Sequence, residues 1–127
     1  DIDHFKVFND SFGHLEGDKV LIRIGQVIKP LLRKMDSAYR YGGEEFTVIL
    51  PETDGKEAQT VAQRIRKAVK MEKFTPEGSS TPESITISLG VTAYNPKEDI
   101  SAFIQRSDKA LYGSKEDGRD QVSAIFI

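Results

Sequence analysis

The sequence contains no cysteine, no strong excess of either charge and no long hydrophobic run. The absence of cysteine excludes disulfides, thiolate nucleophiles and cysteine-ligated zinc. Eighteen Lys and Arg residues stand against 20 Asp and Glu residues, a formal net charge of -2, so no global basic field is available to hold a polyanion by counterion release. No apolar stretch approaches the roughly 20 residues that span a bilayer. We therefore expect no nucleic-acid partner and no membrane contact from this chain.

What remains is the composition of an ordinary globular domain. The chain has 127 residues, of which 38% are hydrophobic and 30% charged, and a chain of this size can build one core without disulfide or metal staples. We expect a single domain over residues 1–127. The chain opens on Asp1 in a polar, turn-rich stretch without a preceding methionine, which we interpret as the start of an excised piece of a longer protein.

Hydrophobic periodicity predicts three helices. Residues 17–35 carry apolar side chains at spacings of three and four, which is typical of a core helix. Pro30 should kink this helix or tighten its last turn, because proline has no N–H group to donate. The same kind of spacing predicts a second helix over residues 58–69 and a third over residues 100–115.

Four strands are predicted between and after these helices. Two short apolar runs at residues 38–41 and 46–50 flank adjacent glycines, which is typical of a β-hairpin. Residues 84–94 are rich in Ile, Thr and Val, with Gly90 as a bulge or a point of close approach, and residues 122–127 indicate a last strand. The order predicts an α/β (α+β sandwich) domain with a mainly antiparallel central sheet flanked by helices.

Acidic and polar side chains gather at the start of the chain and at the hairpin tip. Glu44 and Glu45 follow the tip glycines, where the backbone can approach a ligand closely. The first 18 residues add further acids, two histidines, a lysine and an asparagine. Because Mg²⁺ prefers a few hard oxygens together with substrate phosphates, acids from two elements would suffice for a nucleotide and magnesium site. On composition alone, a solvated loop and an acidic turn remain the alternative.

Several separated segments, in this order, resemble the signature of the GGDEF family, the diguanylate cyclases of bacterial cyclic di-GMP signalling. The matching segments are Asp1-Ile2-Asp3-His4-Phe5-Lys6, Asn9-Asp10, Gly13-His14, Gly17-Asp18, Arg40-Tyr41-Gly42-Gly43-Glu44-Glu45-Phe46, Thr86-Ile87-Ser88-Leu89-Gly90-Val91, Asp108-Lys109-Ala110-Leu111-Tyr112, Lys115 and Gly118-Arg119. The resemblance covers essentially the whole chain. It implies a palm-like nucleotide cyclase fold, truncated so that an N-terminal helix and strand of the family are missing.

The resemblance implies an enzyme that condenses two GTP molecules into cyclic di-GMP and two pyrophosphates between two facing domains, with Mg²⁺ or Mn²⁺ as cofactor. Asp1 and Glu44 would be the metal carboxylates and Ile2 would add its backbone carbonyl. Glu45 would support this metal site. Glu44 would also accept the proton of the attacking 3′-hydroxyl, and Lys6 would stabilise the transition state and the departing pyrophosphate. The alternative for Lys6 is a solvated lysine on a helix.

Further substrate contacts are implied for the guanine and the phosphates. Asn9 offers a donor and an acceptor and Asp18 accepts from the guanine N1 and N2 protons, which favours GTP over ATP. The remaining implied contacts are His14, Gly42, Gly43, Lys115 and Arg119. A hydrogen bond at a helix start is an equally good interpretation of His14. A solvated basic helix end is the alternative for Lys115 and Arg119.

A second site is implied at Arg33 and Asp36, which precede the hairpin where the family places an inhibitory product site. A guanidinium and a carboxylate suit the phosphates and guanine edges of cyclic di-GMP. Arg64 would complete this site from a neighbouring domain. The alternative is a surface helix end at which Arg33 complements the helix dipole. Asp120 stands where the family frequently has Asn, a departure that we expect to be peripheral.

The resemblance further implies a homodimer for catalysis, an upstream sensory or dimerisation domain and a cytoplasmic location, with membrane anchoring of the parent protein left open. One rival to the active enzyme is a catalytically silent GGDEF module that binds GTP or cyclic di-GMP and regulates a partner domain. Silent members generally lose the tip glycines or acids, which this chain keeps. A second rival, an adenylyl-cyclase-like or polymerase-like palm for another nucleotide, fits Asn9 and Asp18 poorly.

Overall fold

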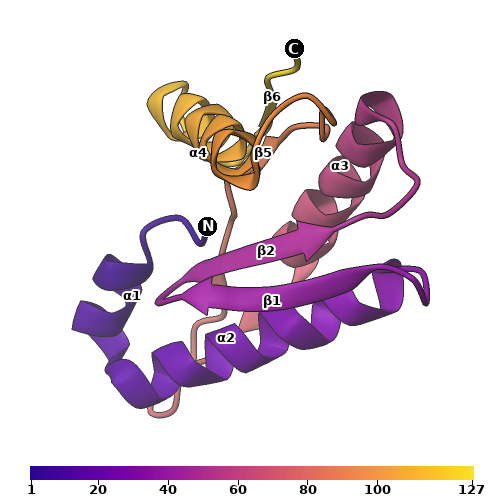
Figure 1. Cartoon of the computed structure of the whole chain (residues 1–127). Coiled ribbons are helices and arrows are strands. Elements are labelled where there is room, and N and C mark those ends of the chain that lie inside the picture. Colours follow the sequence, from indigo (N-terminus) through magenta and orange to yellow (C-terminus); the bar gives the residue numbers. More distant parts are fainter.

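The computed structural model describes residues 1–127 as four α-helices, one short 3₁₀ helix and six strands. In chain order these are α1 (Phe5–Phe12), α2 (His14–Ile28), the 3₁₀ helix η1 (Lys29–Leu31), β1 (Ser37–Gly42), β2 (Glu45–Ile49), α3 (Gly55–Met71), β3 (Lys73–Phe74), β4 (Glu83–Ser84), β5 (Leu89–Val91), α4 (Ile100–Glu116) and β6 (Val122–Ala124). Figure 1 shows the β1–β2 hairpin lying along α2, with α4 beside β5 and β6. α3 packs against α2 and also against β5 and β6.

α2 is the central core helix, and its bounds differ from the predicted residues 17–35. It starts at His14, directly after Gly13 in the left-handed backbone region (φ 93°), and it ends at Ile28. Pro30 lies in η1, which is the tightened last turn expected from its missing N–H group. The α-helix therefore ends before its apolar pattern does, because proline interrupts the regular hydrogen bonding.

The other two long helices confirm the predictions for residues 58–69 and 100–115. α3 begins after Asp54 and α4 begins after Asp99. Each of these aspartates accepts a hydrogen bond from the backbone N–H three residues later, at 2.8 Å in both cases. This is the usual side-chain cap of a helix start. α1 is a helix that the periodicity did not predict.

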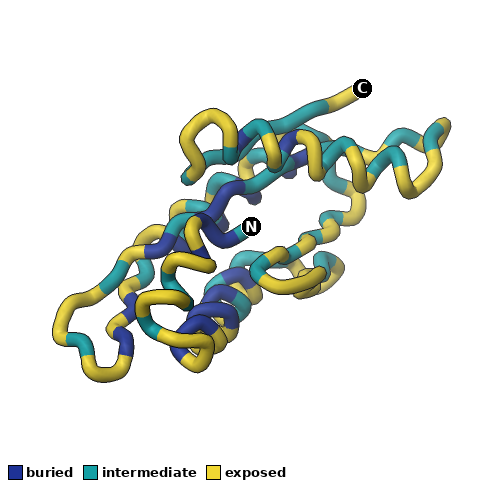
Figure 2. The backbone as a smooth tube through the Cα atoms, turned by 90° about the vertical axis from the view of Figure 1, so that its left-hand side faces the viewer, coloured by how far each residue is buried: buried dark blue, intermediate teal, exposed yellow.

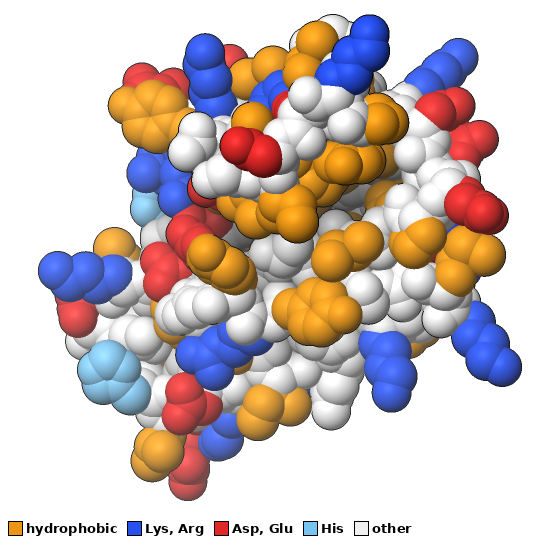
Figure 3. Space-filling model, viewed as in Figure 1, with side chains coloured by type: hydrophobic (Ala, Val, Ile, Leu, Met, Phe, Trp, Pro, Cys, Tyr) orange, Lys and Arg blue, Asp and Glu red, His pale blue; other side chains and the backbone are white.

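β1 and β2 form the predicted hairpin, with Gly42 opposite Glu45. Gly43 and Glu44 make the two-residue turn, and Gly43 has a φ of 41°, a conformation that glycine adopts readily. Phe46 packs from β2 into the hydrophobic core. Figure 3 shows hydrophobic side chains on the opposite face, in the region between the hairpin and α4.

The sheet is divided into three two-stranded pieces. The prediction of one continuous strand over residues 84–94 is wrong, because residues 86–88 pair with residues 1–3 instead of extending a regular ladder. The predicted last strand over residues 122–127 is too long, since β6 ends at Ala124, opposite the end of β5. Two of the three pairs are antiparallel and β5–β6 is parallel, so the mainly antiparallel α+β fold is confirmed.

Two hydrophobic clusters hold the elements together. The larger joins α2 and α3, with Val20, Ile24 and Val69 almost completely buried. The smaller joins α3 to β5 around Ala62 and Val91. Figure 2 shows the buried residues concentrated along the inner side of α2 and where the start of the chain enters the molecule. Each helix is too short or too polar to cross a bilayer.

α4 lies directly on β5 at Gly90, which confirms the predicted point of close approach. A Cβ atom on Gly90 would lie 2.2 Å from the backbone nitrogen of Leu111 and 2.3 Å from the carbonyl oxygen of Ser107. These are backbone atoms of a helix and cannot move aside cheaply. Glycine at this position therefore sets how closely α4, and with it Lys115, approaches the sheet.

Candidate functional site

The start of the chain lies between the hairpin tip and residues 86–88. The Ile2 amide donates to the Glu44 carbonyl at 3.2 Å, and the Ser88 amide donates to the Asp1 carbonyl at 3.0 Å. These bonds join three segments that are far apart in the sequence. They bring Asp1 and Glu44 to the same edge of the molecule.

Acidic side chains surround the first residue, and one lysine neutralises part of their charge. The Asp1 carboxylate is only 4% exposed and forms an ion pair with the Lys115 ammonium group from α4. Three carboxylates, those of Asp3, Glu44 and Glu45, lie close enough to Asp1 to act on it electrostatically. These side chains therefore share one electrostatic environment.

The oxygen donors in this region suit a divalent cation. The carboxylate of Asp1 is buried, and Glu44 is a half-buried residue. The Ile2 carbonyl oxygen accepts no hydrogen bond within the chain. No group of three or more His, Asp or Glu side chains is arranged to hold a metal ion. Because Mg²⁺ commonly takes one or two carboxylates together with substrate phosphates and water, two carboxylates and a carbonyl are a suitable donor set.

Asn9 packs against Gly17, the residue before Asp18, where α1 lies on α2. A Cβ atom on Gly17 would lie 1.8 Å from Asn9 Oδ1, so glycine at this position lets the Asn9 side chain lie against α2. Asn9 Oδ1 is buried and has no hydrogen-bond partner. A buried acceptor without a donor is costly.

The side chains of Lys6 and His14 are exposed, as is that of Asp18. Lys6 lies in the first turn of α1, and His14 is the first residue of α2. His14 is therefore at a helix start, as one interpretation required, but no side chain caps that helix. All three side chains are accessible to a ligand.

The residues expected at the phosphates have different surroundings. Lys115 forms an ion pair with Asp1. Arg119 is exposed in the turn after α4, where its backbone N–H donates to the Ser114 carbonyl at 2.9 Å. Gly42 and Gly43 are exposed at the hairpin, and a Cβ atom on either would meet nothing within 4 Å.

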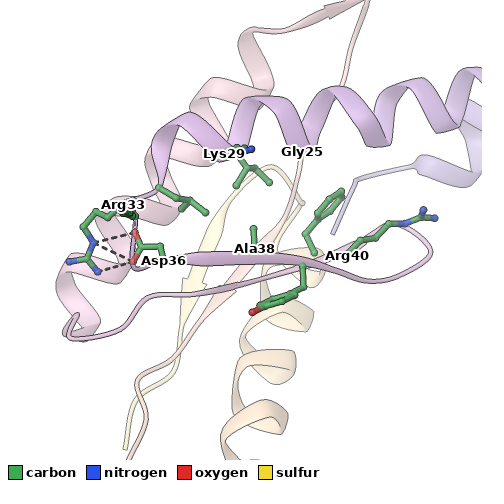
Figure 4. Close-up of a pocket in the computed structure, with 11 residues that line it drawn as sticks. Gly25, Lys29, Arg33, Asp36, Ala38 and Arg40 are labelled. Atoms are coloured by element: carbon green, nitrogen blue, oxygen red, sulfur yellow. Dashed lines mark hydrogen bonds and ion pairs between the residues drawn. The ribbon is translucent and has the colours of Figure 1, made fainter.

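Arg33 and Asp36 form a preassembled pair beside a pocket (Figure 4). The Arg33 guanidinium donates to the Asp36 carboxylate at 2.8 Å, and the same nitrogen contacts the Pro51 carbonyl at 2.8 Å and the Thr53 hydroxyl at 2.7 Å. The hydrogen bond from Arg33 holds the pKa of the Asp36 carboxyl below its usual value. The pocket, of ≈ 480 Å³, lies between α2, η1 and β1. Arg64 lies outside it, along a separate groove of α3.

Sequence reasoning missed Asp3, the acid with the most complete hydrogen bonding near the chain start. Asp3 is 8% exposed and accepts from the hydroxyls of Thr86 and Ser88 at 2.7 and 2.6 Å. Two hydroxyl residues spaced two apart on an extended segment point to the same side. That alternation was the available signal for a buried polar partner.

The fold and these contacts define an α+β domain in which a hairpin tip, the chain start and the end of α4 share one polar site. The family model described as "Diguanylate cyclase, GGDEF domain" matches residues 1–121. The chain therefore belongs to the GGDEF domain family, and the resemblance inferred from its motifs is confirmed.

Similar proteins support the same assignment. Diguanylate cyclase A of Treponema denticola is 45% identical over 124 residues, which cover 97% of this chain and 33% of that protein. Diguanylate cyclase DgcP of Pseudomonas aeruginosa is 45% identical over 122 residues, 96% of this chain and 18% of that protein. The crystal structure of the GGDEF domain of DgcB from Caulobacter crescentus in complex with c-di-GMP aligns with a TM-score of 0.92 at 38% identity, covering 98% of this chain and 73% of that chain. The chain spans a third or less of these two curated relatives.

Proposed function

We propose that this domain is an active diguanylate cyclase, which condenses two GTP molecules into cyclic di-GMP and two pyrophosphates between two facing copies. The observation that carries the proposal is the hydrogen bond between Ile2 and Glu44, which joins the acidic hairpin tip to the acidic chain start. Similarity to proteins named diguanylate cyclases supports it.

Asp1, Glu44 and the Ile2 carbonyl are the proposed ligands of Mg²⁺ or Mn²⁺, with Glu45 in support. The bound metal would neutralise phosphate charge and lower the pKa of the attacking hydroxyl. Each 3′-oxygen forms a bond to an α-phosphorus, pyrophosphate leaves, and Glu44 accepts the hydroxyl proton. Lys6, exposed on α1, would stabilise the negative charge that develops on the phosphates.

Guanine recognition is proposed at the contact of α1 with α2. The side-chain amide of Asn9 would both donate to and accept from the guanine edge, and Asp18 would accept from the N1 proton. Adenine carries no N1 proton and no 2-amino group, so this pair favours GTP. His14, at the nearby start of α2, is a further substrate contact.

The phosphates are proposed to bind Lys115 and Arg119, with the backbone of Gly42 and Gly43 against them. A lysine supplies a point charge and an arginine a planar fork, and both suit phosphate oxygens. Lys115 has to leave the Asp1 carboxylate in order to reach a phosphate, since the two now form an ion pair.

Arg33 and Asp36 are proposed as the inhibitory product site, with Arg64 supplied by a neighbouring domain. The preformed ion pair and its pocket support this assignment, and a related GGDEF domain was crystallised with c-di-GMP. We further propose a cytoplasmic domain that works as a homodimer under an upstream sensory or dimerisation domain. Because each copy holds one GTP, dilution below the dimerisation range should lower the specific rate.

The direct test is Mg²⁺-dependent GTP turnover by the full-length parent protein, with the product identified by mass. Glu44→Gln should abolish cyclic di-GMP formation, because an amide neither accepts the proton nor supplies charge to a metal. Glu52→Gln, a matched change at an exposed residue just after β2, should keep the rate. A folded, dimeric protein that binds GTP or cyclic di-GMP but forms no product would instead establish the silent regulatory module.

A further inference from the structure

The buried carboxylate of Asp3 connects the start of the chain to the turn that follows α4. Besides the hydroxyls of Thr86 and Ser88, it accepts a hydrogen bond from the backbone N–H of Asp120 at 3.0 Å. A buried carboxylate is stable when several donors surround it. Asp3 lies two residues from Asp1, and Asp120 lies one residue from Arg119, so this hydrogen bond links the proposed metal end of the site to its phosphate end.

The side chain of Asp120 is held from a third element. Its carboxylate accepts from Arg66 at 2.9 Å and from Lys70 at 2.5 Å, both on α3. Burial opposes ionisation of Asp120, but the hydrogen bonds from Lys70 and Arg66 outweigh it and hold the pKa of the carboxyl below its usual value. Asp120, which stands where the family frequently has Asn, is therefore anchored to α3.

The backbone of this turn has an uncommon conformation. Three successive residues lie in the left-handed region, namely Gly118 (φ 112°), Arg119 (φ 64°) and Asp120 (φ 48°). Glycine and aspartate tolerate this region, whereas arginine does so at a cost. A strained turn keeps one conformation only when its surroundings over-determine it, and here Asp3 holds the backbone while α3 holds the side chain.

We propose that Asp3 and Asp120 are positioning residues that fix the turn carrying Arg119 relative to Asp1 and so set how tightly the triphosphate of GTP is bound. The inference rests on the proposed function, because it assigns Arg119 to the phosphates. Neither acid needs to touch the substrate. Their effect is expected on triphosphate affinity and not on guanine affinity.

The test measures binding of 3′-deoxy-GTP, which lacks the attacking hydroxyl, and of GMP to the full-length parent protein by calorimetry with Mg²⁺. Asp120→Ala removes both contacts to α3 and a residue type that tolerates the left-handed region. It should weaken the binding of 3′-deoxy-GTP about tenfold and change the affinity for GMP by less than about twofold. Asp120→Asn keeps an oxygen acceptor and should restore most of the affinity.

Asp117→Asn is the matched control, since Asp117 is an exposed acid in the same turn. It should leave both affinities unchanged. Arg119→Ala supplies the reference loss, and the double variant with Asp120→Ala should lose no more than Arg119→Ala alone, because the two residues act through one contact. Lys70→Gln, an exposed change that should not disturb folding, should give a smaller loss in the same direction.

Three results would contradict the proposal, and they are distinguishable. If Arg119→Ala lowers the ratio of 3′-deoxy-GTP to GMP affinity while folded Asp120→Ala and Lys70→Gln leave it unchanged, the positioning role fails and the proposed function stands. If the parent protein binds neither nucleotide, the proposed function fails and the positioning role fails with it. An Asp3→Asn variant that folds and keeps the wild-type ratio would also contradict the role of Asp3.

Discussion

Two nearly buried aspartates, each paired with a basic residue, mark the two proposed sites of the molecule. The side chains of Asp1 and Asp36 are 4% and 3% exposed, and their partners Lys115 and Arg33 are 35% and 50% exposed. The pairs differ in how they are built. Asp36 meets Arg33 three residues away, whereas Asp1 meets Lys115 across almost the whole chain.

The difference shows in how each pair is supported. Arg33 is bonded at once to Asp36, Pro51 and Thr53, so its guanidinium is fixed by neighbours that belong to one region. The pair at Asp1 exists only when the chain start, the hairpin and α4 are assembled. We therefore expect the site at Asp36 to tolerate changes elsewhere in the fold, and the site at Asp1 to depend on the packing of α4.

The largest expected effect separates the two sites by chemistry. Asp1→Asn should lower GTP turnover by about 100-fold or more, because it removes a charged ligand and the partner of Lys115. Cyclic di-GMP affinity, measured by calorimetry on the same protein, should change by less than about twofold, since distant sites act independently. Equal losses in turnover and in product binding would show that the sites are coupled.

The next effect tests whether the packing of α4 controls the site at Asp1. Gly90→Ala places a Cβ atom 2.2 Å from the backbone of Leu111 and should destabilise the domain by about 1–3 kcal/mol, measured by urea unfolding. It should also lower turnover more than it lowers cyclic di-GMP binding.

Gly113→Ala is the matched control on the same helix. A Cβ atom there meets nothing within 4 Å, so alanine should stabilise α4 by about 0.5–1 kcal/mol through its helix propensity. Equal stability of the two variants would show that the contact at Gly90 relaxes without cost.

A smaller effect is expected at the preassembled pair. Asp36→Ala should weaken inhibition by added cyclic di-GMP about tenfold, because the variant loses a reader of the ligand and a partner that orients Arg33. Arg33→Lys keeps the charge but not the planar fork and should give an intermediate loss. Inhibition constants measured at fixed GTP decide the order. Wild-type inhibition in both variants would remove this site from the proposal.

What the sequence could predict follows the same division. Asp36 lies three residues from Arg33, in the turn between η1 and β1, so their pairing is a local property that a short motif reveals. The hairpin and the helices α3 and α4, which hydrophobic spacing predicts, are local in the same sense. The predicted end of α2 lies too far along the chain, because the apolar pattern continues into η1, where Pro30 lacks the N–H donor of a regular helix.

The contacts that sequence reasoning did not find join distant segments. The pairing of Lys115 with Asp1 depends on the packing of α4 at Gly90, and the partners of Asp120 come from α3. The strand over residues 84–94 was predicted as continuous because composition does not show that residues 86–88 pair with the chain start. Periodicity identifies elements, but only their assembly decides which polar groups meet.

The smallest effect concerns acid stability and follows from the sign of one shift. Hydrogen bonds from Arg33 lower the pKa of Asp36 in the folded state, so the ionised carboxylate stabilises the fold. That contribution is complete above the unfolded value of about 3.9 and is lost as the pH falls through the lower folded value. Asp36→Asn should therefore lose less stability than the wild type between about pH 5 and about pH 3, measured by urea midpoints. If the urea midpoints of the two proteins changed with pH in parallel, the ion pair of Asp36 with Arg33 would orient Arg33 without stabilising the fold. Its role would then be limited to ligand recognition.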